Sequence, residues 1–118
     1  MYFDPYSLVL LIRRADAPLV DEASAAAIQD AHMAYLADLH DLKHLAAAGP
    51  TGMGDPNEEI RYLLILHVST DDARRLLEAN PAVRSGFYEL KVLPWIVPEG
   101  AIKFKSADFP RSLAQARG

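Results

Sequence analysis

The stretch YSLVLLI, residues 6–12, is a short apolar run without a helical period. Pro5 precedes it, and Arg13 and Arg14 follow it, so the run is bounded on both sides. A short continuous apolar run with such limits is typical of a buried β-strand. We predict that it forms the first strand of a sheet.

Two later stretches predict further strands. IRYLLILHV (60–68) is apolar on both faces, which is typical of a buried strand. SGFYELKVLPW (85–95) predicts a last strand whose alternating side chains separate onto two faces. One face carries Tyr88, Leu90 and Val92, and the other carries Glu89 and Lys91. We expect this second pair to lie on a solvated face or in a dimer salt bridge, with a polar pocket wall as the alternative. A further short strand is expected within residues 49–53.

Two helices are predicted between these strands. Residues 21–47 are rich in Ala and Leu, with acidic residues in the first turn and a Gly-Pro pair beyond the end, which are helix start and stop signals. Ser69 or the residue after it begins a second helix that runs to about Glu78. Residues 50–59 concentrate Gly, Pro, Asn and Asp and predict a turn-rich loop.

The predicted order is strand, helix, short strand, strand, helix, strand. This βαββαβ order is that of a ferredoxin-like α+β domain, in which both helices cover one face of an antiparallel sheet. The strands at 6–12 and 60–68 are apolar on both faces, so the second face of the sheet also needs cover. We therefore expect a homodimer in which two sheets pack face to face. A cavity for a small-molecule ligand is expected either between sheet and helix or between the two sheets.

The composition excludes several classes of protein. The 118 residues correspond to one domain. The net charge of −4 and the lack of a Lys/Arg cluster argue against nucleic acid as a partner. No apolar run approaches the roughly 20 residues of a membrane span, and the first residues, MYFDPYS, do not resemble a signal peptide, so we expect no membrane partner and a cytoplasmic location. The absence of cysteine rules out disulfides, thiolate chemistry and Cys-ligated metals.

Residues 96–118 are expected to form a C-terminal extension. Pro98, Pro110 and polar ends indicate little regular structure there. The apolar residues that need cover are Ile96, Val97, Ile102 and Phe104. We expect the extension to pack on the domain, over its pocket, or on the dimer partner.

His32 stands out because it occupies an apolar position of the first helix. In IQDAHMAYLADLH (28–40), a turn of about 100° per residue groups His32 with Tyr35 and Leu39, so its side chain points toward the sheet. One interpretation is a core histidine satisfied by a single hydrogen bond. The other is a catalytic residue, because a half-dry pocket lowers the pKa of an imidazole, which can then accept a proton at neutral pH.

A series of spaced motifs surrounds this histidine. They are His32 followed by AYL on the long helix, AAAGP (46–50), STDDARRLLEANP (69–81), Gly86, and the closing PW (94–95). Together they resemble the YCII-related (YciI-like) family over about residues 6–95, so residues 1–95 are expected to form a YCII-like domain. The resemblance implies the fold of the dimeric α+β barrels, no cofactor, and elimination or dehydrochlorination of small cyclic compounds. The broader superfamily adds isomerases and cofactor-free oxygenases.

In that family a helix histidine pairs with an aspartate that precedes a proline. By resemblance His32 holds the first position, and Asn80 in EANPAV replaces the aspartate. An amide can orient the ring through one hydrogen bond, but it cannot stabilise an imidazolium as a carboxylate does. Substrate binding is assigned to Pro81 and Gly86 of the motifs and to Tyr35, whose phenol either meets a substrate oxygen or packs in the core.

Two functions are therefore predicted. The first is a cofactor-independent lyase or isomerase in which His32 is the general acid/base on a small cyclic or phenolic metabolite. The alternative is a non-catalytic small-molecule-binding or accessory dimer that lacks the His–Asp pair of the family because of Asn80.

Other polar residues are weaker candidates. His40 and His44 have the i, i+4 spacing that suits one metal ion, with Asp41 beside them, but they lie at the polar edge of the predicted helix and lack a third ligand. We therefore expect no metal. His67 is expected to form a hydrogen bond at the end of its strand. The alternative is that its side chain reaches the mouth of a cavity. The loop GMGDPN lacks the lysine of a phosphate-binding loop.

Overall fold

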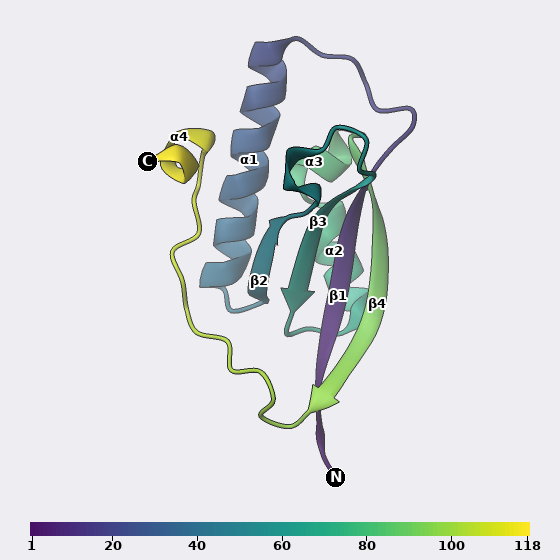
Figure 1. Ribbon diagram of the computed structural model, residues 1–118, viewed down its shortest axis with the longest axis vertical. Coiled ribbons are helices and arrows are strands. Elements are labelled where there is room, and N and C mark those ends of the chain that lie inside the picture. Colours follow the sequence, from purple (N-terminus) through teal and green to yellow (C-terminus); the bar gives the residue numbers. More distant parts are fainter.

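Four antiparallel strands form one sheet in the computed structural model, which describes all 118 residues (Figure 1). They are β1 (Phe3–Arg13), β2 (Leu45–Pro50), β3 (Ile60–Leu66) and β4 (Tyr88–Pro98), in the order β2-β3-β1-β4. Helices α1 (Glu22–Asp41) and α2 (Thr70–Glu78) lie on one face of the sheet, and the short helix α3 (Pro81–Arg84) follows α2. The order and placement are those of the predicted ferredoxin-like α+β fold.

β1 is a central strand because it pairs with β3 on one side and β4 on the other. Its ladder with β4 runs from the pair Phe3–Pro98 to the pair Arg13–Tyr88. The first strand therefore begins before the predicted residue 6, and the last extends beyond residue 95. Pro94 is tolerated inside β4 because this strand lies at the edge of the sheet.

The end of α1 differs from the sequence prediction. The helix ends at Asp41 and not at residue 47, because Lys43 adopts a left-handed backbone conformation with φ of 65°. The His44 N–H then donates to the Leu39 carbonyl at 3.0 Å, which closes the last turn. Pairing of Leu45–Pro50 with β3 overrides the helix propensity of the alanines, so the short strand lies earlier than 49–53. The loop that follows contains the single turn η1 (Gly52–Gly54).

Side chains that cap the helices explain where these begin. Asp21 accepts a hydrogen bond from the Ser24 N–H at 2.6 Å at the start of α1. Ser69 accepts one from the Asp72 N–H at 3.2 Å at the start of α2, as predicted. Asn80 caps α3, which the sequence analysis did not predict as a helix.

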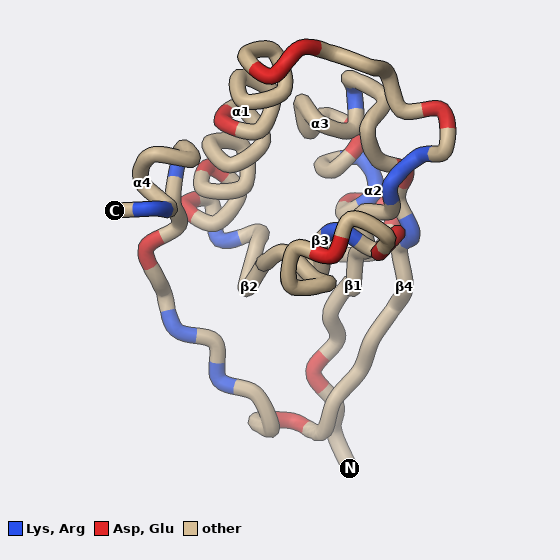
Figure 2. Tube along the Cα trace, turned by 45° about the horizontal axis from the view of Figure 1, so that its top comes forward, with Lys and Arg blue, Asp and Glu red and all other residues tan.

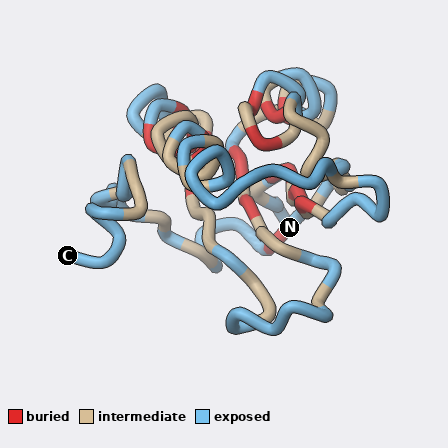
Figure 3. Tube along the Cα trace, turned by 90° about the horizontal axis from the view of Figure 1, so that it is seen from above, coloured by how far each residue is buried: buried red, intermediate tan, exposed pale blue.

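The hydrophobic core lies between the sheet and the helices, where Figure 3 shows most of the buried residues. It is built from Val9 and Leu11 of β1, Leu64 and Leu66 of β3, Leu36 and Leu39 of α1, Leu45 of β2, and Ala73 and Leu77 of α2. Tyr88, Leu90 and Val92 of β4 pack against it, while Glu89 and Lys91 are exposed, as the alternation predicted. No helix is long and apolar enough to cross a membrane.

The opposite face of the sheet is also apolar but carries no helix. Because Val9 and Leu11 face the helices, Leu8 and Leu10 point to the other face. The register places Leu8 beside Ile65 and Leu93, and Leu10 between Leu63 and Lys91. All five side chains of this bare face (Leu8, Leu10, Leu63, Ile65 and Leu93) are partly exposed in the single protomer. We propose that a second copy covers them.

The C-terminal extension runs past β2 to the outer side of α1 (Figure 1). Phe104 packs edge-on against Tyr6 at 5.4 Å between ring centroids, and Phe109 stacks on His40 at 4.2 Å. Arg111 binds Asp38 at 2.8 Å and Asp41 at 2.5 Å. Figure 2 shows basic positions in this segment and acidic positions along α1. The segment ends in the short helix α4 (Leu113–Arg117), whose first N–H donates to Asp30 at 2.7 Å.

We expect the protein to sediment as a dimer at micromolar concentration. Leu8→Glu should shift it to monomer. Leu8 lies between Ile65 and Leu93, so the new carboxylate would have no basic neighbour, and burying it in a sheet-to-sheet interface is unfavourable by roughly several kcal/mol. Leu19→Glu, at a fully exposed position outside the sheet, is the matched control and should leave the dimer intact. A wild-type protein that sediments as a monomer contradicts the proposal.

Removal of residues 101–118 should lower the melting temperature by about 10 °C, because Phe104 and Phe109 would no longer cover Tyr6 and His40. Differential scanning calorimetry measures the change. Removal of residues 114–118 alone, all exposed, is the control with little expected effect. Equal melting temperatures for the wild type and the longer truncation would show that the extension adds no stability.

Candidate functional site

The centre of the candidate site is a contact between His32 of α1 and Asn80 at the start of α3. Both residues are completely buried, with 0% of their surface exposed. The side-chain nitrogen Nδ2 of Asn80 lies 2.9 Å from Nδ1 of His32, and its oxygen Oδ1 lies 3.1 Å from the same atom. The fold thus joins two residues that are 48 positions apart in the chain.

Asn80 is held in place by its role as a helix cap. Its Oδ1 accepts a hydrogen bond from the Ala82 N–H at 2.9 Å, which begins α3. Pro81 occupies the first position of this helix, where its missing N–H costs nothing. The local sequence NPA therefore determines where the amide lies, and α1 brings the imidazole to it.

The second ring nitrogen of His32 has no partner. Nε2 is the one buried side-chain nitrogen or oxygen atom of the protein without a hydrogen bond. Buried polar atoms are nearly always paired in native proteins, and the exceptions are often at functional sites. The imidazole is thus held at one nitrogen and free at the other.

Two tyrosines and a glutamine surround the imidazole. The Tyr62 ring of β3 lies 4.7 Å from the His32 ring, nearly perpendicular to it, and the Tyr88 ring of β4 lies 6.2 Å away. Gln29 of α1 donates a hydrogen bond to the Tyr62 hydroxyl at 3.2 Å. None of these three residues was expected at the site from the sequence, although strand alternation had placed Tyr88 on one face with Leu90 and Val92.

Every titratable group of this cluster is neutral at pH 7. Burial lowers the pKa of His32 below its ordinary range, so the imidazole is uncharged. Burial raises the pKa of Tyr62, and burial together with the neighbouring Tyr62 raises the pKa of Tyr88. With an amide at position 80, the site contains no carboxylate to attract a proton to the ring.

Two cavities of about 200 Å³ each lie beside the cluster. The first lies between α1, α3 and β4 and is lined by Ala25, Ile28, Gln29, Ala82, Phe87 and Tyr88. Tyr62 belongs to the wall of the second, together with residues of α1, β2 and the C-terminal extension. His32 lines neither cavity, contrary to our expectation, but its ring neighbours a tyrosine in the wall of each.

The residues predicted to bind substrate lie at different distances from this cluster. Pro81 is adjacent to Asn80. Tyr35 points toward α2, where its hydroxyl donates to the Leu76 carbonyl at 2.6 Å. Gly86 forms the turn between α3 and β4 with φ of +84°, a conformation that favours glycine. Their role in substrate binding stays a prediction.

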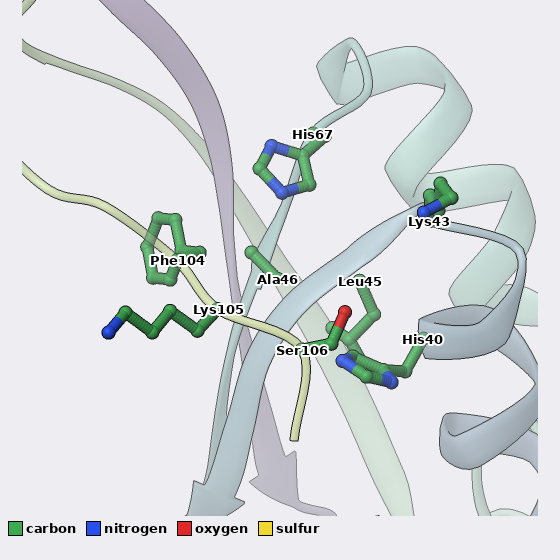
Figure 4. A pocket seen from close by; sticks show the side chains of 8 residues that line it. All are labelled: His40, Lys43, Leu45, Ala46, His67, Phe104, Lys105 and Ser106. Carbon is green, nitrogen blue, oxygen red and sulfur yellow. The ribbon is translucent and has the colours of Figure 1, made fainter. Parts of the chain in front are cut away.

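The remaining histidines do not form a metal site. His44 follows the end of α1, so the i, i+4 geometry predicted for it and His40 does not exist. His40 and His67 line a separate cavity of about 190 Å³ that the extension covers with Phe104, Lys105 and Ser106 (Figure 4). No group of three or more His, Cys, Asp or Glu residues is placed to hold a metal ion. The His67 N–H donates to the His44 carbonyl at 2.9 Å.

Comparison with known proteins identifies the family. A family model described as the YCII-related domain matches residues 5–96, which include His32, Asn80 and both tyrosines. The chain belongs to the YCII-related family. A search of curated proteins finds no match.

One solved structure similar to this YCII-related chain is 5-chloro-2-hydroxyhydroquinone dehydrochlorinase (TftG) from Burkholderia phenoliruptrix AC1100, in complex with 2,5-dihydroxybenzoquinone. The two chains are 26% identical, with a TM-score of 0.54, and the match covers 76% of this chain and 92% of the other. The predicted family and the α+β fold are thereby confirmed.

The pH dependence of stability provides a test of the buried, neutral His32. Its pKa is lowered in the folded state, so the unfolded chain binds the proton more readily below about pH 6.5, the ordinary pKa of histidine. We expect the free energy of unfolding to fall as the pH decreases below that value, by at most about 1.4 kcal/mol per pH unit from this group. His32→Gln should remove this contribution in urea unfolding between pH 7 and pH 5.

His67→Gln, which removes an exposed histidine, is the matched control and should keep the wild-type pH dependence. An NMR titration of the His32 ring in the wild type makes the same test without a substitution. A ring that titrates at or above its ordinary pKa would contradict a buried neutral imidazole.

Proposed function

We propose that this protein is a cofactor-independent lyase that acts on small cyclic hydroxylated compounds, with His32 as the residue that exchanges a proton with the substrate. The observation that carries the proposal is the buried imidazole of His32, held by Asn80 at Nδ1 and unpartnered at Nε2. An elimination needs a group that gives or takes a proton at a defined atom. Imidazole suits that role because its two nitrogens can serve separate partners.

The size and lining of the neighbouring cavities support a one-ring substrate. Each cavity has a volume of about 200 Å³. An apolar protein cavity of about 150 Å³ is large enough to hold benzene. The polar groups close to His32 are the Tyr62 and Tyr88 phenols and the Gln29 amide, which suit hydroxyl and carbonyl oxygens on a ring.

The similar dehydrochlorinase supports the same reaction class. TftG is described as acting on 5-chloro-2-hydroxyhydroquinone and was solved with 2,5-dihydroxybenzoquinone, both single rings that carry several oxygens. We propose that the substrate of the present protein belongs to this chemical class.

A binding protein without catalysis is the second candidate. The observation that favours it is Asn80, because an amide cannot stabilise the imidazolium that forms when a histidine accepts a proton. In that case the dimer would bind an oxygenated ring without converting it.

We expect His32→Gln to lower the rate of chloride release from 5-chloro-2-hydroxyhydroquinone about 100-fold, the usual scale for loss of a proton-transfer residue. Glutamine retains a hydrogen-bonding group near Asn80, and circular dichroism would check the fold. His44→Gln, outside the cluster, is the control and should keep the wild-type rate. Equal rates for wild type and His32→Gln would exclude His32 as the catalytic residue.

The two candidate functions differ in one further result. Binding of 2,5-dihydroxybenzoquinone by the wild type without turnover of any chlorinated hydroxyhydroquinone would favour the binding protein.

A further inference from the structure

The orientation of the Asn80 amide follows from the hydrogen bond that caps α3. A backbone N–H can only donate, so the amide atom that faces the Ala82 N–H at 2.9 Å is the oxygen. The Nδ2 group is then the atom that lies 2.9 Å from His32 Nδ1, and this nitrogen is its only hydrogen-bond partner. The amide thus presents a donor to the ring.

This orientation distinguishes the two neutral forms of the imidazole. With the proton on Nδ1, the ring N–H would face the Nδ2 donor at 2.9 Å and compete with Ala82 for Oδ1, and the buried Nδ2 group would lack an acceptor. With the proton on Nε2, Nδ1 accepts from Nδ2 and all Asn80 atoms are satisfied. Each form leaves one buried donor unpaired, the Nδ2 group in the first and the Nε2–H in the second. The second form is favoured because only the first sets two N–H donors against each other at 2.9 Å.

We propose that Asn80 holds His32 as its Nε2–H tautomer, and that this N–H is the donor that the site offers to a carbonyl or phenolate oxygen of a small cyclic ligand. The inference rests on the proposed function, because it names the ligand atom that His32 meets. The free Nε2 atom supports it, since a buried N–H without a partner needs an acceptor.

In this form Nε2 can donate a hydrogen bond or a proton to a ligand oxygen, and it has no lone pair with which to remove a proton. A neutral imidazole N–H can stabilise negative charge on a carbonyl or phenolate oxygen of the ligand by donating a hydrogen bond to it. Ligands whose polar groups only donate, such as ammonium compounds, are disfavoured. Tyr62 belongs to the wall of one cavity and Tyr88 to the wall of the other, and His32 is completely buried. A ligand in either cavity would therefore meet Nε2 only after one of these rings moves.

A carboxylate at position 80 would reverse this chemistry. One oxygen would accept from the Ala82 N–H, and the other would accept from a proton on Nδ1, leaving the lone pair of Nε2 as a base. The exchange of one amide for a carboxylate therefore decides whether His32 donates or accepts at the ligand. Asn80 is a positioning residue in this proposal because it acts through His32.

The test is the protonation state of the two ring nitrogens, measured by two-bond ¹H–¹⁵N NMR correlation on protein with ¹⁵N-labelled histidine at pH 8. We expect a protonated Nε2 and an unprotonated Nδ1 in His32, identified by its contacts with the Tyr62 ring. Asn80→Asp should move the proton to Nδ1. Asn57→Asp, the same change at the exposed second asparagine of the chain, is the matched control and should leave the pattern unchanged.

A wild-type His32 with the proton on Nδ1 would overturn the proposal. If Asn80→Asp fails to fold, the wild-type spectrum alone still decides the tautomer.

Titration with 2,5-dihydroxybenzoquinone tests the donor role. We expect the Nε2–H resonance of His32 to shift on binding, because a new acceptor would pair with it. Binding with an unmoved Nε2 signal would overturn the donor role, and absence of binding at millimolar concentration would overturn the ligand class.

The outcomes for tautomer and turnover are independent. An Nε2–H tautomer with no turnover would refute the proposed lyase and retain the donor site. Turnover with the proton on Nδ1 would support the proposed lyase and overturn the donor site.

Discussion

The position of β1 at the centre of the sheet is the constraint on which the rest of the structure depends. This strand pairs with β4 over its entire length and with β3 over Ser7–Ile12, and its side chains there are apolar on both faces. One face therefore requires the helices, which Val9 and Leu11 contact in the core. The other face carries no helix, and Leu8 and Leu10 on it remain partly exposed in one protomer.

The helices that cover one face of β1 also position the residues of the candidate site. The α1 helix lies against the sheet with His32 on the same side as Leu36 and Leu39, so the imidazole is buried together with the core. Helix α3 packs against α1 at the same level, and its cap residue Asn80 becomes the partner of the ring. The site thus lies between α1, α3 and the strands β3 and β4, which carry Tyr62 and Tyr88.

The side chain of Asn80 has two roles, one in the fold and one at the candidate site. Its oxygen begins α3, and its nitrogen contacts His32. An aspartate would also cap the helix, since both residues are favoured at this position. An aspartate here would therefore preserve the start of α3, and in our proposal it would change mainly which nitrogen of the imidazole carries the proton.

Local sequence patterns were sufficient to predict the type and order of the principal elements. Apolar runs located three strands, start and stop signals located two helices, and the helical period oriented His32 toward the sheet. The motif resemblance paired His32 with Asn80. These features depend on neighbouring residues or on motif spacing, so a single sequence is enough to reveal them.

Only the tertiary structure decided the end of α1, the full length of β4 and the surroundings of His32. Residues 45–47 have helix-forming composition, yet pairing with β3 draws them into a strand. Tyr62, Tyr88 and Gln29 come from three separate elements, and no local period relates them to one another. The orientation of the Asn80 amide likewise depends on the Ala82 N–H and the His32 ring, which are brought together by long-range packing that local sequence patterns do not encode.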